Sequence, residues 1–282
     1  MERTQSIRQK AIRLILRFYL AICTCGIILP TLWTILTSFK STSEFLVNPF
    51  GLPEVFYPEN YINAWKMAKI GNYFFSSMCI SAIVCIVVVI LGSMTAYACT
   101  RLRIRAGGLV IACYMLGVFI PVELCIVPIF LQLRGLHLLD THLGLVLLYI
   151  AIRLPFTVFI LAGNFKTLPH ELEEAAIIDG CSYNQVFWKV MMPLAKPGLA
   201  TVTIFNFLSI WNEYVLAKTI MLTPDKVTLP VGLISLQAAT RHQCDYGALF
   251  AGMVIVMIPT LIVYMIFQKQ LTSGITAGAV KG

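Results

Sequence analysis

Charged residues are scarce in this sequence. Asp, Glu, Lys and Arg make up 12% of its 282 residues, whereas soluble domains carry about a quarter. Apolar residues make up 59%, and the mean hydropathy is +0.84. A water-soluble fold could not cover its surface with so few charges. The composition therefore excludes a soluble globular domain and requires lipid as the solvent.

The motifs of several enzyme classes are also missing. There is no G-x-x-x-x-G-K-[ST] phosphate loop, so this chain is not expected to hydrolyse ATP. The four histidines have no partners at metal-ligand spacing, and no nucleophile–base pair is recognisable. We expect no bound metal or cofactor and no catalytic residues.

A disulfide framework is equally unexpected. The chain has nine cysteines, an odd number, and most stand inside apolar runs, where a thiol behaves as a small apolar group. Only Cys244 falls clearly in a loop on the side expected to be outside.

Six stretches of low charge are each long enough for the roughly 20 residues that a membrane-spanning helix needs. They cover Phe18–Phe39, Asn72–Thr100, Gly108–Leu133, Thr141–Phe165, Pro197–Lys218 and Tyr246–Gln268. The predicted fold is all-α, a polytopic membrane protein with six transmembrane helices.

The net charge of +8 fits orientation in a membrane better than nucleic-acid binding, because the charges lie between the apolar runs. With the N-terminus inside, thirteen Lys and Arg residues lie in inner segments and seven in outer ones. Both termini are therefore expected in the cytoplasm. The predicted segments are a tail at 1–17, a first span with its outer loop at 18–71, a core at 72–268 and a tail at 269–282.

The inner loop 166–197 differs from the others. Glu171, Glu173 and Glu174 suit the start of a helix, and Gly180 suits its left-handed end. Ser182 and Gln185 have capping-box spacing for a second helix, which Pro193 is expected to stop. The loop is predicted to be a helix–turn–helix on the inner face.

The surface of this loop suggests protein docking. Ala175 and Ala176 offer a small, smooth patch, and Phe187 and Met191 are among the adaptable apolar side chains expected beside it. An interfacial hairpin on lipid headgroups is the alternative, but three glutamates facing an anionic leaflet disfavour it.

Glu174-Ala175-Ala176, followed by Gly180 and Pro193, resembles the EAA loop of binding-protein-dependent ABC importer permeases. Glu-Ala-Ala-Ile-Ile-Asp-Gly at 174–180 resembles the carbohydrate-uptake branch, in particular the smaller maltose-type permease. Further matches extend over nearly the whole chain, including Ser38-Phe39-Lys40, Trp211-Asn212-Glu213-Tyr214 and the C-terminal Thr-Ala-Gly-Ala-Val-Lys-Gly.

The resemblance implies an inner-membrane permease of a bacterial importer, with a sugar or oligosaccharide as its solute. It implies that the loop couples ATPase closure to alternating access. The coupling residues would be Glu174, Ala175, Ala176, Asp179, Gly180 and Pro193, with Asp179 as an N-cap or second-helix contact. The implied partners are a second permease subunit, two cytoplasmic ATPase subunits, which use the ATP, and an extracytoplasmic solute-binding protein.

Charges inside the predicted spans are the other notable feature, since an unpaired charge there costs several kcal/mol. Glu123, Arg153, Asn212 and Glu213 are candidates for a gate or solute pathway. The alternative is structural, with Arg153 neutralising Glu123 or Glu213. Trp211 could stack on a sugar ring or anchor the chain at the interface.

Two other functions remain open at this point. An ion-coupled secondary transporter could use Glu123 and Arg153, and it would predict inverted repeats and broken helices. An ABC permease for a non-sugar solute, such as a polyamine or glycerol phosphate, has no distinguishing feature in the sequence.

Overall fold

The computed structural model describes residues 7–102, 104–243 and 245–279, and Cys244 lies outside them. Every regular element within these ranges is helical, which confirms the all-α fold class. The elements are α1 (Ile7–Thr37), α2 (Thr42–Val47), α3 (Glu59–Ile62), η1 (Asn63–Met67), α4 (Ile70–Arg101), α5 (Gly107–Val118), η2 (Val122–Cys125), α6 (Ile126–Gly135), α7 (His142–Thr167), α8 (Glu171–Ile178), α9 (Tyr183–Gln185), η3 (Val186–Met191), α10 (Met192–Leu194), α11 (Lys196–Trp211), α12 (Val215–Ile220), η4 (Pro224–Lys226), α13 (Leu229–Gln243) and α14 (Tyr246–Ala279).

Within the described residues, four helices are long and apolar enough to cross a membrane without interruption. They are Ile12–Thr37, Ile70–Arg101, His142–Thr167 and Tyr246–Gln268, and each begins and ends within a few residues of a predicted span, apart from the earlier start of the first. Length and composition therefore defined these spans well, because each is a single apolar run of sufficient length.

The other two predicted spans are interrupted in the structure. Within 108–133 the chain bends by 84° between Val118 and Val122, next to Pro121, which supplies no backbone N–H. Within 197–218, α11 ends at Trp211 after 16 residues, or about 24 Å, and α12 begins only at Val215.

Contacts within the chain divide it into two units, 1–70 with 235–255 and 71–234 with 256–282. In the first unit, the segment after α1 is fastened by buried polar groups. Asn60 Nδ2 donates to the carbonyl oxygens of Ser38 and Lys40 at 2.9 and 2.8 Å, and the buried Lys40 Nζ donates to that of Asn48 at 2.8 Å. The trace from 38 to 60 is thus fixed by hydrogen bonds.

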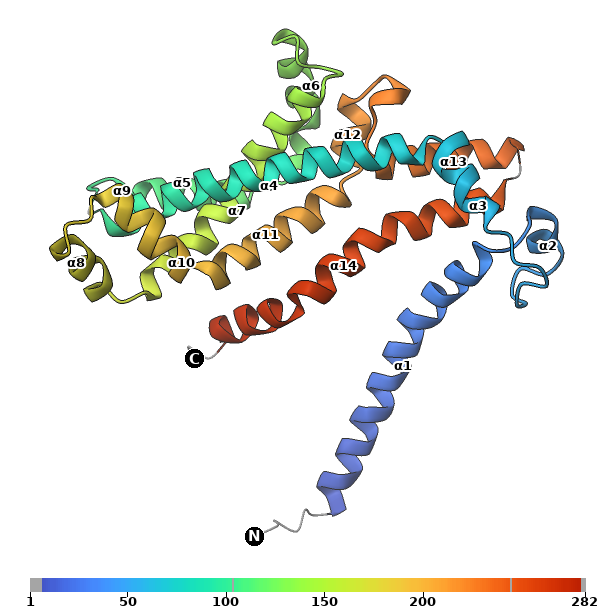
Figure 1. The fold of residues 1–282 in the computed structure, drawn as a ribbon, viewed down its shortest axis with the longest axis horizontal. Helices are drawn as coiled ribbons and strands as arrows, with labels where there is room; N and C mark the ends of the chain where they lie inside the picture. Colours follow the sequence, from blue (N-terminus) through green and yellow to red (C-terminus); the bar gives the residue numbers. More distant parts are fainter. Residues whose placement is uncertain (1–6, 103, 244, 280–282) are drawn as a thin grey trace. The chain divides into compact units, whose positions relative to one another are not determined.

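The second unit contains the helices that position the functional residues. Its core joins α4, α7 and α11 to the short helices of the 166–197 loop, and Figure 1 shows that loop at one end of α4 and α7. Tyr97 packs against Phe165 and Phe187, with ring centroids 5.8 and 5.1 Å apart. The loop is therefore packed onto the spans.

Candidate functional site

The 166–197 loop forms the predicted helix–turn–helix. Gly180, after the end of α8, has φ +87°, a left-handed conformation that glycine adopts readily. Ser182 and Gln185 form the expected capping box at the start of α9. The turn and the second helix start were thus readable from sequence.

Two details of this hairpin differ from the expectation. Asp179 caps the C-terminus of α8, while Ser182 is the N-cap of the second helix, so Asp179 is no N-cap. The second helix of the hairpin is formed by α9, η3 and α10 in succession, so it continues through Pro193 to Leu194. Its middle part, η3, is a π-helix that ends at Met191, two residues before Pro193. A wider turn before proline relieves the clash of its ring with the preceding turn.

The outward face of α8 is the candidate docking surface. Glu174, Ala175 and Asp179 are exposed, as are Gly180 and Pro193 in the rest of the hairpin. Ile178 is 84% exposed, and Leu172 is also exposed. We name Leu172, Glu174, Ala175, Ile178 and Asp179 the α8 surface. Leu172, Ala175 and Ile178 recur at a spacing of three, which could have signalled one helical face from the sequence.

Several residues assigned to docking lie in the core instead. Ala176 packs inward with Val186, and Phe187 and Met191 are buried in the same cluster. Sequence composition marked these residues as apolar but could not say which face they occupy. Their observed contacts fasten the hairpin to the membrane helices.

One side chain joins three elements beneath the α8 surface. Arg101, the last residue of α4, has its Nε 3.4 Å from Glu173 Oε1, and these side chains are 1% and 11% exposed. Its Nη2 also donates to the carbonyl oxygens of Phe165, at 2.6 Å, and Leu168. Arg101 thus links the ends of α4 and α7 to the buried face of α8.

A groove of about 570 Å³ adjoins this ion pair and the side of α8. It is lined by Tyr97, Arg101, Leu102, His170, Glu173, Glu174, Ile177 and Tyr183. Its lining combines apolar surface with the charged groups of Arg101, Glu173 and Glu174, so this part of the hairpin surface can receive a partner with both polar and apolar side chains.

The break between α11 and α12 contains the second candidate site. Glu213 accepts hydrogen bonds from the N–H groups of Leu216 and Ala217, at 2.7 and 3.0 Å, and from the Tyr149 hydroxyl at 2.5 Å. Its carboxylate therefore caps α12 and fixes it to α7. Asn212 is exposed beside it.

Arg153 does not form the expected direct ion pair. Among the described residues it has no carboxylate within 4.0 Å, although Glu213 and Glu123 both lie within electrostatic range. Its Nε is buried without a hydrogen-bond partner there. Glu213 is occupied by α12 instead, and Glu123 is exposed in η2 at the 84° bend.

Trp211 is not available to a solute. It is fully buried, its indole N–H donates to the Val256 carbonyl at 3.1 Å, and its ring packs on Phe207 and Phe74. The sequence could not distinguish this packing role from stacking on a sugar.

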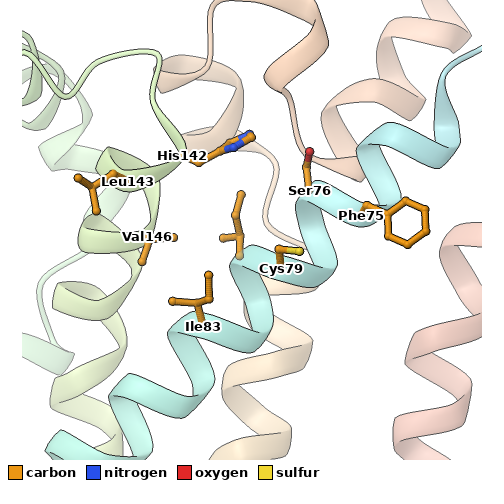
Figure 2. A pocket seen from close by; sticks show the side chains of 8 residues that line it. Phe75, Ser76, Cys79, Ile83, His142, Leu143 and Val146 are labelled. Atoms are coloured by element: carbon orange, nitrogen blue, oxygen red, sulfur yellow. The ribbon is translucent and has the colours of Figure 1, made fainter.

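An apolar groove between α4 and the start of α7 does not suit a sugar either. It measures about 460 Å³, and Figure 2 shows Phe75, Ile83, Leu143 and Val146 among its lining side chains. His142, the most polar of them, has its Nε2 2.9 Å from the Lys226 carbonyl oxygen. Hydroxyl groups would find few partners in this groove.

At the end of α7 away from α8, Asp140 fastens the loop 222–226. Its carboxylate accepts from the Thr223 hydroxyl at 2.5 Å, from the N–H groups of Thr223 and Leu222, and from Lys226 Nζ. The hydroxyl, followed by the two N–H groups and the ammonium, holds the pKa of Asp140 well below its ordinary range. Within the described residues, no group of three or more His, Cys, Asp or Glu could hold a metal ion.

Comparison with known proteins identifies a family and several relatives with similar sequences. Residues 89–277 match the family model described as "binding-protein-dependent transport system inner membrane component". The chain is 42% identical over 252 residues to the diacetylchitobiose uptake system permease protein NgcG of Streptomyces coelicolor, covering 89% of this chain and 83% of that one. It is 33% identical to the trehalose transport system permease protein SugB of Mycobacterium tuberculosis, over 90% and 93% of the two chains.

The fold has a solved counterpart. A chain from the crystal structure of a bacterial ABC transporter involved in the import of the acidic polysaccharide alginate superposes with a TM-score of 0.81 and 25% identity. The match covers 94% of this chain and 98% of that chain. The chain therefore belongs to the family of inner membrane components of binding-protein-dependent transport systems.

Proposed function

We propose that this chain is the permease subunit that couples a cytoplasmic ATPase to the import of a sugar or oligosaccharide. The family requires a separate ATPase and a solute-binding protein. A second, different permease subunit and two ATPase subunits complete the proposed assembly. The excess of Lys and Arg in the inner segments supports an orientation with both termini in the cytoplasm.

The observation that carries the coupling role is the α8 surface on a firmly fixed base. Glu174, Ala175 and Asp179 are exposed, while Glu173 and Ala176 on the opposite face are buried. The exposed face can enter a cleft in the ATPase. The buried face passes its displacement to α4 and α7 through Arg101 and the surrounding core.

The sugar assignment rests on the relatives. One of them is named for diacetylchitobiose uptake and another for trehalose transport, and the solved counterpart is named for the import of alginate. For contact with the solute we propose Asn212, Arg153 and Glu123, since these groups are exposed or have unfilled hydrogen-bonding capacity. Glu213 would position the α11–α12 break beside them.

Broken spans, which the ion-coupled alternative predicted, are present here, so they do not separate the two functions. The family match favours the ATP-driven importer over the ion-coupled transporter, because members of the family work with a solute-binding protein. A permease for a non-sugar solute stays the second candidate.

The docking proposal is tested by disulfide cross-linking in the assembled transporter. Ala175→Cys should cross-link to a cysteine in the ATPase cleft, and ATP should change the yield. Gly163→Cys, a glycine of α7 with open space around it, is the control. Equal yields at both positions would contradict docking through α8.

A further inference from the structure

The segment 46–56, which begins in the last turn of α2 in the first unit, carries an unusual set of exposed apolar side chains. Val47 is 87% exposed, Phe50 83% and Leu52 74%. Leu46, Val55 and Phe56 are exposed as well. We name residues 46–56 the apolar loop. Contiguous apolar surface of this kind marks contact with a protein or a membrane.

The depth of this loop along α1 is set by Trp33. The Trp33 indole N–H donates to the Pro49 carbonyl at 2.9 Å, and the Trp33 and Phe50 ring centroids are 5.8 Å apart. Trp33 precedes the end of α1 at Thr37 by one helical turn, or about 6 Å. Phe50 therefore lies below the end of the span rather than above it.

The length of α1 relates this depth to the bilayer. The span Ile12–Thr37 has 26 residues, or about 39 Å, which exceeds the roughly 30 Å of hydrocarbon. About 4 to 5 Å at each end then reaches the headgroup region. Trp33 and Phe50 fall close to the boundary between headgroups and hydrocarbon, where tryptophan is enriched in membrane proteins.

The backbone of the loop is also held in shape by hydrogen bonds and a ring contact. Lys40 Nζ binds the Asn48 carbonyl, and Asn48 Oδ1 accepts from the N–H of Gly51 at 3.0 Å. Further along, the Phe56 ring stacks on Phe39 with centroids 4.3 Å apart. These contacts fix the backbone and leave Val47, Phe50 and Leu52 pointing outward.

We propose that the apolar loop inserts into the lipid interface of the leaflet at the C-terminal end of α1. Lipid is the favoured occupant because the loop is continuous with α1, whose 26-residue apolar stretch Ile12–Thr37 is long enough to cross a membrane. Glu54 is the only charged residue in 46–56, whereas a surface for transient protein docking carries a polar rim. The loop would anchor the C-terminal end of α1 in the membrane, independently of which solute is transported.

The test uses the full chain in cells that make the assembled transporter. A photoreactive phenylalanine analogue, p-benzoylphenylalanine, is placed at Phe50, whose shape it keeps, and separately at Glu59. Glu59 is exposed at the start of α3, beyond the apolar loop, and serves as the water-facing control. Membranes are irradiated, and the chain is analysed by intact mass and by gel.

The expected result is an adduct with the mass of one phospholipid at position 50, at several times the yield at position 59. The same analogue at Leu52 should give the same adduct. A cross-link from position 50 to the solute-binding protein or the second permease would overturn the proposal. A phospholipid yield at position 50 no higher than at position 59 would overturn it as well.

Discussion

Arg101 Nε lies 3.4 Å from Glu173 Oε1, so a buried ion pair joins the end of α4 to the inward face of α8. Because the same guanidinium also binds the carbonyls of Phe165 and Leu168, three elements share one side chain. Removing one partner of a buried pair leaves the other charge without compensation, which costs about 3–5 kcal/mol.

Arg101→Leu should therefore destabilise the hairpin and lower the amount of solute imported per ATP hydrolysed. The double variant Arg101→Leu with Glu173→Leu should recover part of the stability, since no lone carboxylate stays buried. Thermal unfolding of the purified complex and the transport-to-ATPase ratio measure these effects. Arg105→Leu, an exposed arginine nearby, is the control and should leave both unchanged. An Arg101→Leu variant with a normal ratio would refute the linking role.

Gly180→Ala should weaken the 166–197 hairpin, the proposed coupling element, through the backbone alone. A Cβ at Gly180 has open space, so the cost comes from φ +87° and is about 1–3 kcal/mol. Gly180→Val should be worse, and Gly180→Asn milder, because asparagine tolerates this conformation. Co-purification of the ATPase measures the outcome, and Gly163→Ala is the helical control. Equal retention of the ATPase by the valine and asparagine variants would contradict the backbone argument.

Glu213→Ala should reduce solute uptake while leaving the ATPase bound. The change removes the acceptor for two N–H groups at the start of α12, at a cost of about 0.5–2 kcal/mol. Tyr149→Phe keeps this cap and removes only the hydroxyl, so it should be milder. Uptake and ATPase co-purification are measured together. If the Glu213→Ala variant loses the ATPase as well as uptake, the substitution disturbs more than the break between α11 and α12, which would contradict this prediction.

Asp140 should give the folded chain a sensitivity to acid. Its pKa is lowered in the folded state by Thr223, Leu222 and Lys226, so its contribution to stability is present above the unfolded value of about 3.9. This contribution to stability is lost as the pH falls below the unfolded-state pKa and then through the lower pKa of Asp140 in the folded chain. Asp140→Asn, which suits φ +57° equally well, should lack this dependence. Unfolding temperatures between pH 6 and pH 3 compare the two chains, and parallel profiles would contradict the prediction.

The parts of this structure that sequence reasoning captured are local ones. Gly180 at a helix end and the Ser182–Gln185 capping box depend on residues a few positions apart, and apolar length defined four spans. Family resemblance supplied the function, which composition alone could not.

The parts that sequence reasoning missed depend on tertiary contacts. Ala175 and Ala176 are adjacent and identical, yet one is exposed and the other buried, because α8 packs on Val186 and its neighbours. The Arg101–Glu173 link joins distant segments, and the Glu213 cap requires the break after Trp211. The depth of Arg153 along its helix likewise did not reveal which neighbouring helix its side chain faces.

Reconstitution tests the central claim most directly. The chain is placed in liposomes with its second permease, its ATPase and its loaded solute-binding protein, and uptake of labelled sugar is measured with ATP, without ATP, and with an ion gradient alone. The account predicts uptake only when ATP and all partners are present, and neither uptake nor ATP hydrolysis by the chain alone. Uptake by the chain alone, driven by an ion gradient without ATP, would contradict it.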